Sequence, residues 1–315
     1  MKAAVLGAKG LEIRDIEQPR IKPGQLLVHV RYAGLNRRDL TRAKGDEGTV
    51  PGLDWAGEVA EAGAEVKDFK PGDPVMCMGA AGYAEYAVAE TSQTLPLPAK
   101  CSFETAATLP VALLTMHDAV VTNGMLKPGE TVLIQGASSG VGLMGLQIAK
   151  LKGAALVAGS SRRSKDRLKS FGADLALDTD DPGWVETLTK ATGGKGVDLV
   201  VDQVSGKIFN QTQQATAIGG RIVNVGRLGG MVAEFDFNLH ALRRLRYVGV
   251  TFRTRSREQV RDIARRAQAE LWPALEAGKL SLPVDKVYPL GEAEAAHARM
   301  RANEHFGKIL LRMGD

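Results

Sequence analysis

The sequence predicts an α/β protein in which a β-rich domain is interrupted by a second domain with a doubly wound parallel sheet. Three observations predict this class. The chain has 315 residues, which exceeds the size at which a single hydrophobic core keeps growing, so two domains are expected. Strand and turn patterns fill the chain up to about residue 110. After about residue 131, apolar strand runs alternate with helical segments.

The first domain is predicted from short strands separated by turns. Residues 26–32 form an apolar β run, residues 57–61 alternate between apolar and polar side chains, and a Pro-Gly-Asp turn lies at 71–73. A mostly apolar stretch from 104 to about 123, broken at Pro110, indicates a helical connection. The pattern changes after this connection.

The second domain follows the strand and helix alternation of a parallel sheet with helices on both faces. A buried-strand run at 131–135 leads into a glycine turn and an apolar helix. Further strands are expected at 155–158, 197–201, 221–225 and 247–250, with helices at 164–171, 184–192 and 211–217. The tail from about residue 253 carries two helices and two strands, at 284–288 and 308–311, and is expected to return to the first domain.

The composition excludes several classes of protein. No apolar run approaches the roughly 20 residues of a membrane-spanning helix, and the N-terminus becomes charged too soon for a signal peptide. We therefore expect a cytoplasmic protein with no membrane role. Cys77 and Cys101 lack the close spacing of a zinc site or redox motif, so reduced thiols are expected.

The net charge of +5 raises the question of nucleic-acid binding. Arg261, Arg265 and Arg266 are spaced as the solvated face of a helix that also carries apolar residues at core spacing, namely Ile263, Ala264, Ala267 and Leu271. No aromatic residues alternate with these charges. Nucleic acid is therefore not expected as the primary partner.

A dinucleotide-binding motif opens the second domain. Residues 140–145 read Gly-Val-Gly-Leu-Met-Gly, follow an apolar strand and begin a helix, which is the context that the fingerprint requires. Gly140 permits the tight turn, Gly142 lets the backbone approach a pyrophosphate, and Gly145 lets the helix close on the strand. Ser138 and Ser139 add hydroxyl donors at a helix N-terminus that favours an anion. The motif predicts a Rossmann domain that holds a nicotinamide dinucleotide.

The end of the second strand indicates which dinucleotide is bound. An NAD site usually places Asp or Glu there, about 20 residues after the first glycine, to bind the ribose hydroxyls. This chain has Ser160, followed by Ser161, Arg162, Arg163 and Lys165, which can donate to a 2′-phosphate. The pattern favours NADPH. The alternative is that Ser160 or Ser161 caps the next helix and the basic side chains lie in solvent.

Four stretches carry a resemblance to a known family: residues 106–115, the loop 136–142, Gly-Gly-Arg at 219–221 and Phe-Gly-Lys at 306–308. The whole chain resembles the quinone oxidoreductase (zeta-crystallin-like) branch of the zinc-independent medium-chain dehydrogenase/reductase superfamily. The resemblance implies a GroES-like catalytic domain over 1–113 and 253–315 and a Rossmann domain over 114–252. It also implies a cleft between them and a homodimer formed through the last Rossmann strand.

Zinc-dependent alcohol dehydrogenases share this architecture, so the residues at the positions of their ligands indicate whether this chain can hold zinc. Asn36 stands where those enzymes have the first ligand cysteine, and Leu53 and Asp54 fall within their Gly-His-Glu motif. A catalytic zinc needs three N, S or O ligands and an open position, which this set cannot supply. No metal site is predicted. The remaining chemistry is hydride delivery to an electrophilic carbon, as in a quinone or an activated alkene (enone or enal).

The resemblance also implies the residues of the site. Asn36 and Thr115 are expected beside the nicotinamide as catalytic residues, and Lys308 is expected to close over the cofactor. Asn224, Val225 and Gly226 are expected as the loop beside the ring, and Phe252 as the strand end. The residues expected to bind NADPH are Ser138, Ser139, Gly140, Val141, Gly142, Ser160, Ser161, Arg162, Arg163, Lys165, Asn224, Val225, Gly226, Phe252 and Lys308.

Several positions depart from the family pattern. Thr41 stands where many members have a tyrosine shortly after the asparagine, and Asp178 where many have a tyrosine beside the adenosine, so a tyrosine proton donor is not expected. The Arg-Arg-Asp stretch at 37–39 replaces a bulky apolar pair. It is interpreted as an ion pair on a solvated turn, the alternative being a more polar rim of the site.

The leading hypothesis is an NADPH-dependent, zinc-independent quinone or enone reductase acting on a small molecule. A second hypothesis is an enoyl-thioester reductase, because reductase domains of polyketide synthases are similar around Leu35-Asn36 and Leu109-Pro110. A hypothesis of another class is a non-catalytic NADPH-binding protein, like the crystallin or RNA-associated members of the family. Mixing with NADPH and a quinone discriminates the enzyme from the binding protein.

Overall fold

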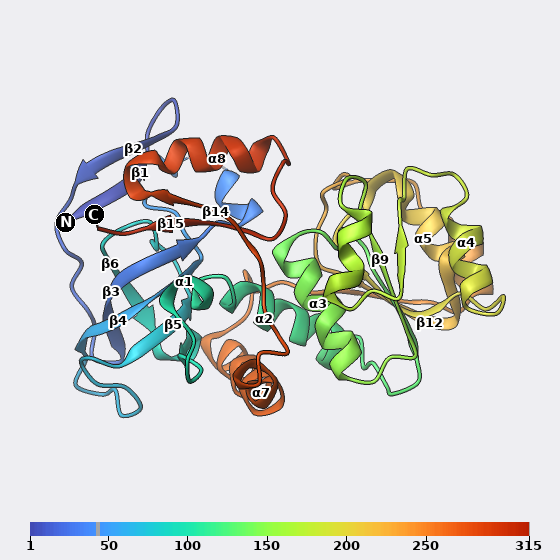
Figure 1. The fold of residues 1–315 in the computed structure, drawn as a ribbon, viewed down its shortest axis with the longest axis horizontal. Coiled ribbons are helices and arrows are strands. Elements are labelled where there is room, and N and C mark those ends of the chain that lie inside the picture. Colours follow the sequence, from blue (N-terminus) through green and yellow to red (C-terminus); the bar gives the residue numbers. More distant parts are fainter. Residues whose placement is uncertain (42–44, 315) are drawn as a thin grey trace. The chain divides into compact units, whose positions relative to one another are not determined.

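The computed structural model describes residues 1–41 and 45–314, which fold into two compact units. One unit comprises Met1–Val111 and Ser256–Asp315, and the other comprises Ala112–Arg255. The sequence-based boundaries, at 113/114 and 252/253, lie close to these junctions. Each unit has its own sheet in the ribbon of Figure 1. The α/β class, with a β-rich domain and a parallel-sheet domain, is confirmed.

The first unit is built on a seven-stranded sheet that combines both ends of the chain. Its strand β3 (Gln25–Gly34) pairs antiparallel with β4 (Asp54–Ala62) and with β15 (Lys308–Arg312). The tail therefore returns to the first domain, as predicted. The other elements are β1 (Lys2–Leu6), β2 (Leu11–Asp15), η1 (Arg37–Leu40), β5 (Pro74–Met78), β6 (Tyr86–Glu90), η2 (Thr91–Gln93), β7 (Thr94–Pro96), α1 (Phe103–Ala106), α7 (Arg257–Glu276), β14 (Val284–Pro289), η6 (Leu290–Glu292) and α8 (Ala293–Arg301).

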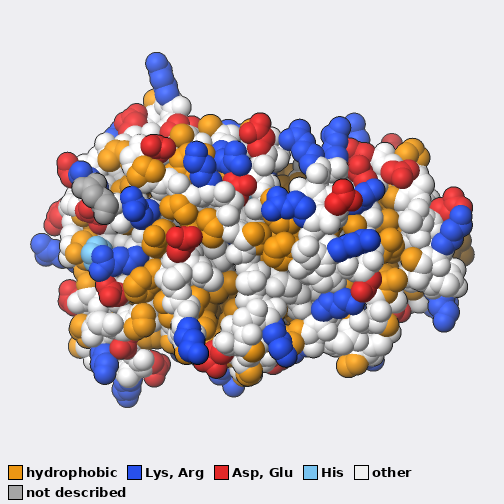
Figure 2. All heavy atoms as spheres, viewed as in Figure 1, with side chains coloured by type: hydrophobic (Ala, Val, Ile, Leu, Met, Phe, Trp, Pro, Cys, Tyr) orange, Lys and Arg blue, Asp and Glu red, His pale blue; other side chains and the backbone are white. Residues whose placement is uncertain are grey.

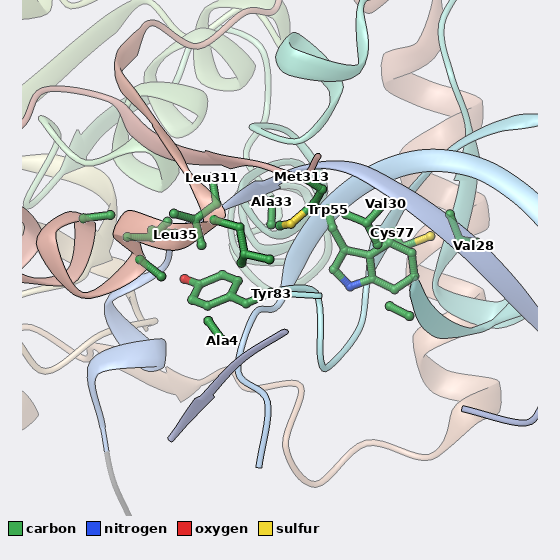
Figure 3. Close-up of a cluster of buried hydrophobic side chains, with 14 of the residues drawn as sticks. Ala4, Val28, Val30, Ala33, Leu35, Trp55, Cys77, Tyr83, Leu311 and Met313 are labelled. Atoms are coloured by element: carbon green, nitrogen blue, oxygen red, sulfur yellow. The ribbon is translucent and has the colours of Figure 1, made fainter. Parts of the chain in front are cut away.

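The core of this unit follows from the alternation of side chains along the strands. Leu26, Val28 and Val30 of β3 lie two residues apart, point to one face and are fully buried. They pack with Trp55 and Tyr83, whose rings lie among aliphatic side chains in Figure 3. Burial of one such large side chain stabilises the fold by about 1.5–3 kcal/mol. This core fixes the strands from which the functional side chains project.

The second unit contains a six-stranded sheet in which every strand pair is parallel. The order is β10 (Leu175–Leu177), β9 (Leu156–Ser160), β8 (Thr131–Ile134), β11 (Val197–Asp202), β12 (Thr216–Asn224) and β13 (Arg246–Gly249). The chain starts in the middle at β8, winds outward to β10, and then returns to β11. Ligands of such sheets bind at the carboxyl ends of the strands where the winding direction reverses, here between β8 and β11.

The helices of the second unit lie on both faces of its sheet, with α3 on one side of β9 and α4 and α5 on the other in Figure 1. They are α2 (Pro110–Met116), which begins in the first unit, the π-helical His117–Asn123 (η3), α3 (Gly140–Leu151), η4 (Lys165–Phe171), α4 (Trp184–Ala191), η5 (Gly206–Ile208), α5 (Phe209–Ala215) and α6 (Phe237–Leu242). Pro110 begins α2, because its fixed φ and missing N–H suit the first helical position.

Three elements of the second unit differ in detail from the sequence prediction. Residues 165–171 form a 3-10 helix, which ends at Gly172 with a φ of 97°. The helix predicted to reach residue 217 ends at Ala215, because Thr216 already has extended backbone and begins β12. Strand β10 was not predicted. Among the described residues, no helix combines the length and the apolar character that crossing a bilayer requires.

Candidate functional site

The loop between β8 and α3 forms a compact cradle in the second unit. Gly136 has a φ of +67°, a left-handed conformation that glycine adopts without strain. The N–H of Ala137 donates to the carbonyl of Ser160 at 2.8 Å, which ties the loop to the end of β9. Ser139 is the N-cap of α3, and its hydroxyl accepts the N–H of Gly142 at 3.0 Å.

The three glycines of the motif have separate structural roles. A Cβ on Gly142 would lie 2.6 Å from the Ala137 Cα and the Gly136 carbonyl oxygen, so the loop backbone itself excludes a side chain there. This is an additional reason for a glycine at 142, and the predicted approach of the backbone to a pyrophosphate stays a prediction. A Cβ on Gly145 would lie 2.9 Å from the Met116 Sδ and within 3.4 Å of Ile134 on β8. Gly145 therefore lets the helix close on the strand, as predicted.

The N-terminus of α3 retains donors that an anion could use. Within the part of the chain that the structure describes, the backbone N–H groups of Gly140 and Val141 have no acceptor. They begin a helix of 12 residues, whose dipole favours negative charge at this end. The hydroxyl of Ser139 is already used as a cap and toward the Gly136 carbonyl oxygen, at 3.1 Å. The cradle fits a pyrophosphate through backbone groups.

The residues predicted to bind the 2′-phosphate lie at and just after the end of β9. Some of them already have partners in the structure and others do not. Ser160 is buried, and its hydroxyl accepts the Gly136 N–H at 3.2 Å, while the hydroxyl of Ser161 accepts the Ser164 N–H at 3.2 Å. Both serine hydroxyls thus accept backbone N–H groups of the protein. Arg162 is exposed and pairs with Asp180 at 3.0 Å.

Arg163 and Lys165 differ from Arg162. Both side chains are exposed, and neither has an ion-pair partner among the described residues. Two cations are therefore available at the point where the 2′-phosphate of NADPH was predicted. Position 160 is a serine, whereas an NAD site usually has a carboxylate there.

The predicted nicotinamide loop lies at the carboxyl end of β12. Asn224 donates from Nδ2 to the Ser205 hydroxyl at 2.6 Å and to the Gly226 carbonyl oxygen at 3.2 Å. The N–H groups of Val225 and Gly226 donate to the carbonyl of Asp202. A Cβ on Gly226 would lie 2.7 Å from the Gln203 carbonyl oxygen, so this loop is held close against the end of β11.

Phe252 and Thr115 complete the predicted residues of the second unit. Phe252 lies three residues beyond the end of β13, with the guanidinium of Arg255 5.8 Å from the ring centre. Thr115 is half-buried in α2. The catalytic role of Thr115 and the cofactor contact of Phe252 stay predictions.

The first unit brings Asn36 and Lys308 together with Asp54. The strand register pairs Gly34 of β3 with Asp54 at the start of β4 and with Leu310 of β15. Asn36 donates from Nδ2 to Asp54 Oδ2 at 2.9 Å, and Lys308 Nζ lies 2.6 Å from the same oxygen and 3.1 Å from Asn36 Oδ1. All three residues are buried. We call these three residues the Asn36 cluster.

Asp39 was misinterpreted from the sequence. It is buried, and its Oδ2 accepts the Asn36 N–H at 2.8 Å and the Tyr83 hydroxyl at 2.9 Å. Burial raises the pKa of the Asp39 carboxyl to about 6, although these hydrogen bonds and the Lys308 ammonium lower it. Arg37 instead donates to the Met300 carbonyl oxygen at 3.0 Å. The prediction of an ion pair on a solvated turn was therefore wrong. The Asp39 carboxylate is buried, where its hydrogen bonds hold the turn that begins at Asn36.

Sequence reasoning missed Asp39, Tyr83 and the pairing of Asp54 with Lys308. The spacing of Asp39 three residues after Asn36 is a capping signal that could have indicated the first of these. No local pattern indicates Tyr83. The Asp54 and Lys308 contact joins residues 254 positions apart and depends on the strand order.

The positions of the zinc ligands do not offer a ligand set. Leu53 has no donor atom, the Asn36 amide and the Asp54 carboxylate are both engaged in hydrogen bonds, and Lys308 places a positive charge beside them. Among the described residues, no group of three or more His, Cys, Asp or Glu side chains could hold a metal ion.

Comparisons with known proteins agree with this architecture. Residues 22–99 match the model of the alcohol dehydrogenase GroES-like domain, and residues 140–269 match that of the zinc-binding dehydrogenase domain. The chain is 30% identical to a quinone oxidoreductase of Sus scrofa over 94% of this chain and 92% of that protein. It is also 30% identical to erythronolide synthase EryA2 of Saccharopolyspora erythraea over 94% of this chain, but over 8% of that much longer protein.

Among solved structures, an NAD-dependent alcohol dehydrogenase superposes with a TM-score of 0.85 and 30% identity, with each chain covered fully. The fold, the glycine-rich cradle and these likenesses lead to one conclusion: the chain belongs to the quinone oxidoreductase branch of the medium-chain dehydrogenase/reductase superfamily.

Proposed function

We propose that this oxidoreductase transfers hydride from NADPH to a quinone or an activated alkene (enone or enal) without zinc. The observation that carries the proposal is the Asn36 cluster, in which the Asn36 amide and the Asp54 carboxylate stand at positions of the zinc-enzyme motifs and Asp54 is paired with the buried Lys308 ammonium. Without a Lewis acid to polarise an alcohol, an acceptor must already be electrophilic. Quinones and enones meet this requirement.

The proposed cofactor is NADPH. The α3 N-terminus would bind the pyrophosphate, and Arg163 and Lys165 are the cations at the end of β9 that no described carboxylate neutralises. The other predicted contacts with NADPH, such as those of Ser138 and Lys308, stay part of the proposal. Because one similar structure is named NAD-dependent, the preference between NADPH and NADH is a decisive measurement.

The chemistry divides between cofactor and protein. Bound NADPH supplies the hydride. Asn36 and Thr115 would position the acceptor and the nicotinamide ring, since misplacing reacting atoms by about 1 Å can cost on the order of a hundredfold in rate. With no tyrosine at Thr41, water is the proposed proton source.

A homodimer and a cytoplasmic location complete the proposal. The second unit exposes Phe237, Leu242 and Tyr247 at and near the edge strand β13, and a second copy could cover such side chains.

Both cysteines are free thiols, in keeping with a reducing compartment. On the face drawn in Figure 2, basic side chains are interspersed with acidic ones, which supports a small-molecule partner over nucleic acid.

The enoyl-thioester alternative is supported by the similarity to a polyketide synthase. One assay separates the candidates: NADPH oxidation followed at the nicotinamide absorbance band with a quinone, an enone and an enoyl thioester, with and without a strong chelator. We expect chelator-resistant turnover with the quinone or enone. Faster turnover with the thioester would favour the alternative, and tight NADPH binding without turnover would favour the non-catalytic protein. Activity that tracks one zinc per chain would refute zinc independence.

Asn36→Ala provides the matched test of the site. We expect NADPH binding within a few-fold of the parent and lower turnover, because the side chain positions the reactants and does not hold the cofactor phosphates. Full activity with every accepted quinone and enone would place the reaction elsewhere.

A further inference from the structure

The Asn36 cluster assembles a carboxylate, an ammonium and an amide inside the first unit. The exposed fractions of Asn36, Asp54 and Lys308 are 8%, 0% and 3%. Burying a charge costs free energy unless it is paired and hydrogen-bonded. The cluster therefore needs a specific arrangement, and the structure shows which one.

Asp54 is the centre of this arrangement. Its Oδ1 accepts the backbone N–H of Val111 at 2.6 Å, at the start of α2. Its Oδ2 accepts Asn36 Nδ2 at 2.9 Å and Lys308 Nζ at 2.6 Å. Both oxygens are thus used, and the plane of the carboxylate is fixed by donors from three segments of the chain.

The direction of the Asn36 amide follows from its two charged neighbours. Nδ2 faces the carboxylate of Asp54 and also lies 3.3 Å from the Gly34 carbonyl oxygen, whereas Oδ1 faces the ammonium of Lys308. A reversed amide would place its N–H groups against the ammonium and its oxygen against the carboxylate. Charge alone therefore selects one of the two orientations.

One donor of the cluster is still available. A lysine ammonium has three hydrogens, and Lys308 directs one to Asp54 and one to Asn36. Its third hydrogen has no acceptor among the residues that the structure describes. The amide donor of Asn36, in contrast, is already used inside the cluster.

We propose that Asp54 is a positioning residue that holds Lys308 and orients Asn36, so that the Lys308 ammonium stabilises the oxygen of the acceptor. This role rests on the proposed function and adds to the cofactor contact proposed for Lys308. The electrophilic carbon of the acceptor gains a hydride and its electron pair, and the π electrons move to the carbonyl oxygen. The ammonium faces that negative oxygen, and a proton from water then completes the reduction.

The test uses the full chain and compares Asp54→Asn and Lys308→Met with the control Glu58→Gln. Glu58 lies on the same strand and forms a half-exposed pair with Arg31, so its variant also loses an ion pair. We expect Asp54→Asn and Lys308→Met each to lower kcat with an enone by on the order of a hundredfold. The KM for NADPH should stay within a few-fold in Asp54→Asn, which keeps the Lys308 side chain, and Glu58→Gln should match the parent.

The double variant shows whether Asp54 acts through Lys308. If it does, Asp54→Asn combined with Lys308→Met should be no slower than the slower single variant. Lys308→Arg should recover most of the lost kcat, because it keeps the charge. Multiplying losses in the double variant, or kcat within a few-fold of the parent in Asp54→Asn, would overturn the proposal. If Asp54→Asn fails to fold, the double variant and Lys308→Arg can still be measured, because neither leaves a buried charge unpaired.

A spectroscopic measurement is independent of turnover. The side-chain amide resonances of Asn36, assigned by their loss in Asn36→Ala, should shift in Asp54→Asn and stay in place in Glu58→Gln. Unmoved resonances would refute the positioning of Asn36 by Asp54. If the parent reduces no acceptor at all, the proposed function and the role of Lys308 both fail, while the resonances still decide whether Asp54 orients the amide.

Discussion

Arg163 and Lys165 are the residues on which the choice of cofactor depends most directly. We expect Arg163→Ala and Lys165→Ala each to weaken NADPH binding by about 1–3 kcal/mol, roughly 5- to 150-fold, because each would remove a charged hydrogen bond to the 2′-phosphate. NADH binding should not change. Fluorescence titration with both cofactors measures the effect.

Arg162→Ala is the matched control for these variants. Arg162 lies in the same segment, but its guanidinium is paired with Asp180, so its loss should change NADPH affinity much less. Equal affinity of the parent for NADPH and NADH would contradict the cofactor assignment as a whole.

Asp39 is expected to make the stability of the protein depend on pH between about 4 and 6. Its pKa is raised to about 6 in the folded protein, from an ordinary value of 3.8. In this window the folded state holds a proton that the unfolded state has lost, so the free energy of unfolding falls as pH rises and stays lower above pH 6.

Asp39→Asn tests this dependence. An asparagine oxygen can still accept the Asn36 N–H and the Tyr83 hydroxyl, but the group no longer titrates. Urea unfolding at pH 5 and pH 7.5 should show a smaller loss of stability with rising pH for the variant than for the parent. Parallel pH profiles would show that Asp39 is already ionised at pH 5.

Local motifs indicated the cradle residues and the family resemblance indicated Asn36 and Lys308, but no pattern indicated the contacts that strand pairing makes between Asn36, Lys308 and Asp54. The cradle residues lie within one turn and its helix, so their spacing carries the information. The contact between Asp54 and Lys308 depends on β3 lying between β4 and β15, which no short pattern encodes. Asp39 has a local signal, but its burial depends on Tyr83, 44 residues away.

At the level of elements, α3 lies close to the β8–α3 loop and to its neighbours. A methyl group added at a glycine of α3 should therefore lower the free energy of unfolding, by an amount that depends on the atoms it meets. Gly142→Ala should lower the free energy of unfolding by about 1–3 kcal/mol, because its Cβ would meet loop backbone that cannot move aside. Gly145→Ala should cost less, since the nearest atom is the flexible Met116 Sδ. Urea unfolding curves measure both.

Gly291→Ala is the control, because its Cβ would meet nothing within 4 Å. Its effect should stay within about 0.5 kcal/mol. Gly142→Asp should in addition abolish NADPH binding, since it places a negative charge beside the pyrophosphate site. Equal effects of the three alanine variants would contradict the close approach.

Strands and helices were predicted best where apolar periodicity is strong. The runs that became β3, β8, β11 and β15 are buried and regular, whereas β10 has three residues and only one of them is buried. The end of α5 was missed because the helix runs directly into β12 without a loop. Short edge strands and uninterrupted junctions depend on tertiary pairing, which a single sequence shows weakly.

For the whole molecule, we expect a dimer that a single charge can dissociate. Phe237 is 78% exposed in the second unit, so Phe237→Asp should leave the circular dichroism spectrum of the folded chain nearly unchanged. If a second copy covers this side chain, the variant should be monomeric by light scattering, because a carboxylate would then be buried unpaired. A monomeric parent, or a variant that remains dimeric, would contradict the proposed interface.

The pairing of β15 with β3 has a consequence for the order in which the chain folds during its synthesis. The unit Ala112–Arg255 is continuous, so a ribosome that has released residue 255 has released everything the parallel sheet requires. The unit that begins first must wait for its last strand, because Lys308 reaches the carboxylate of Asp54 only after 254 further residues have been made. Until then Asp54 has no ammonium partner. The part of the protein translated first should therefore be the part completed last, and stalled nascent chains should resist protease over 112–255 before they resist it over 1–111.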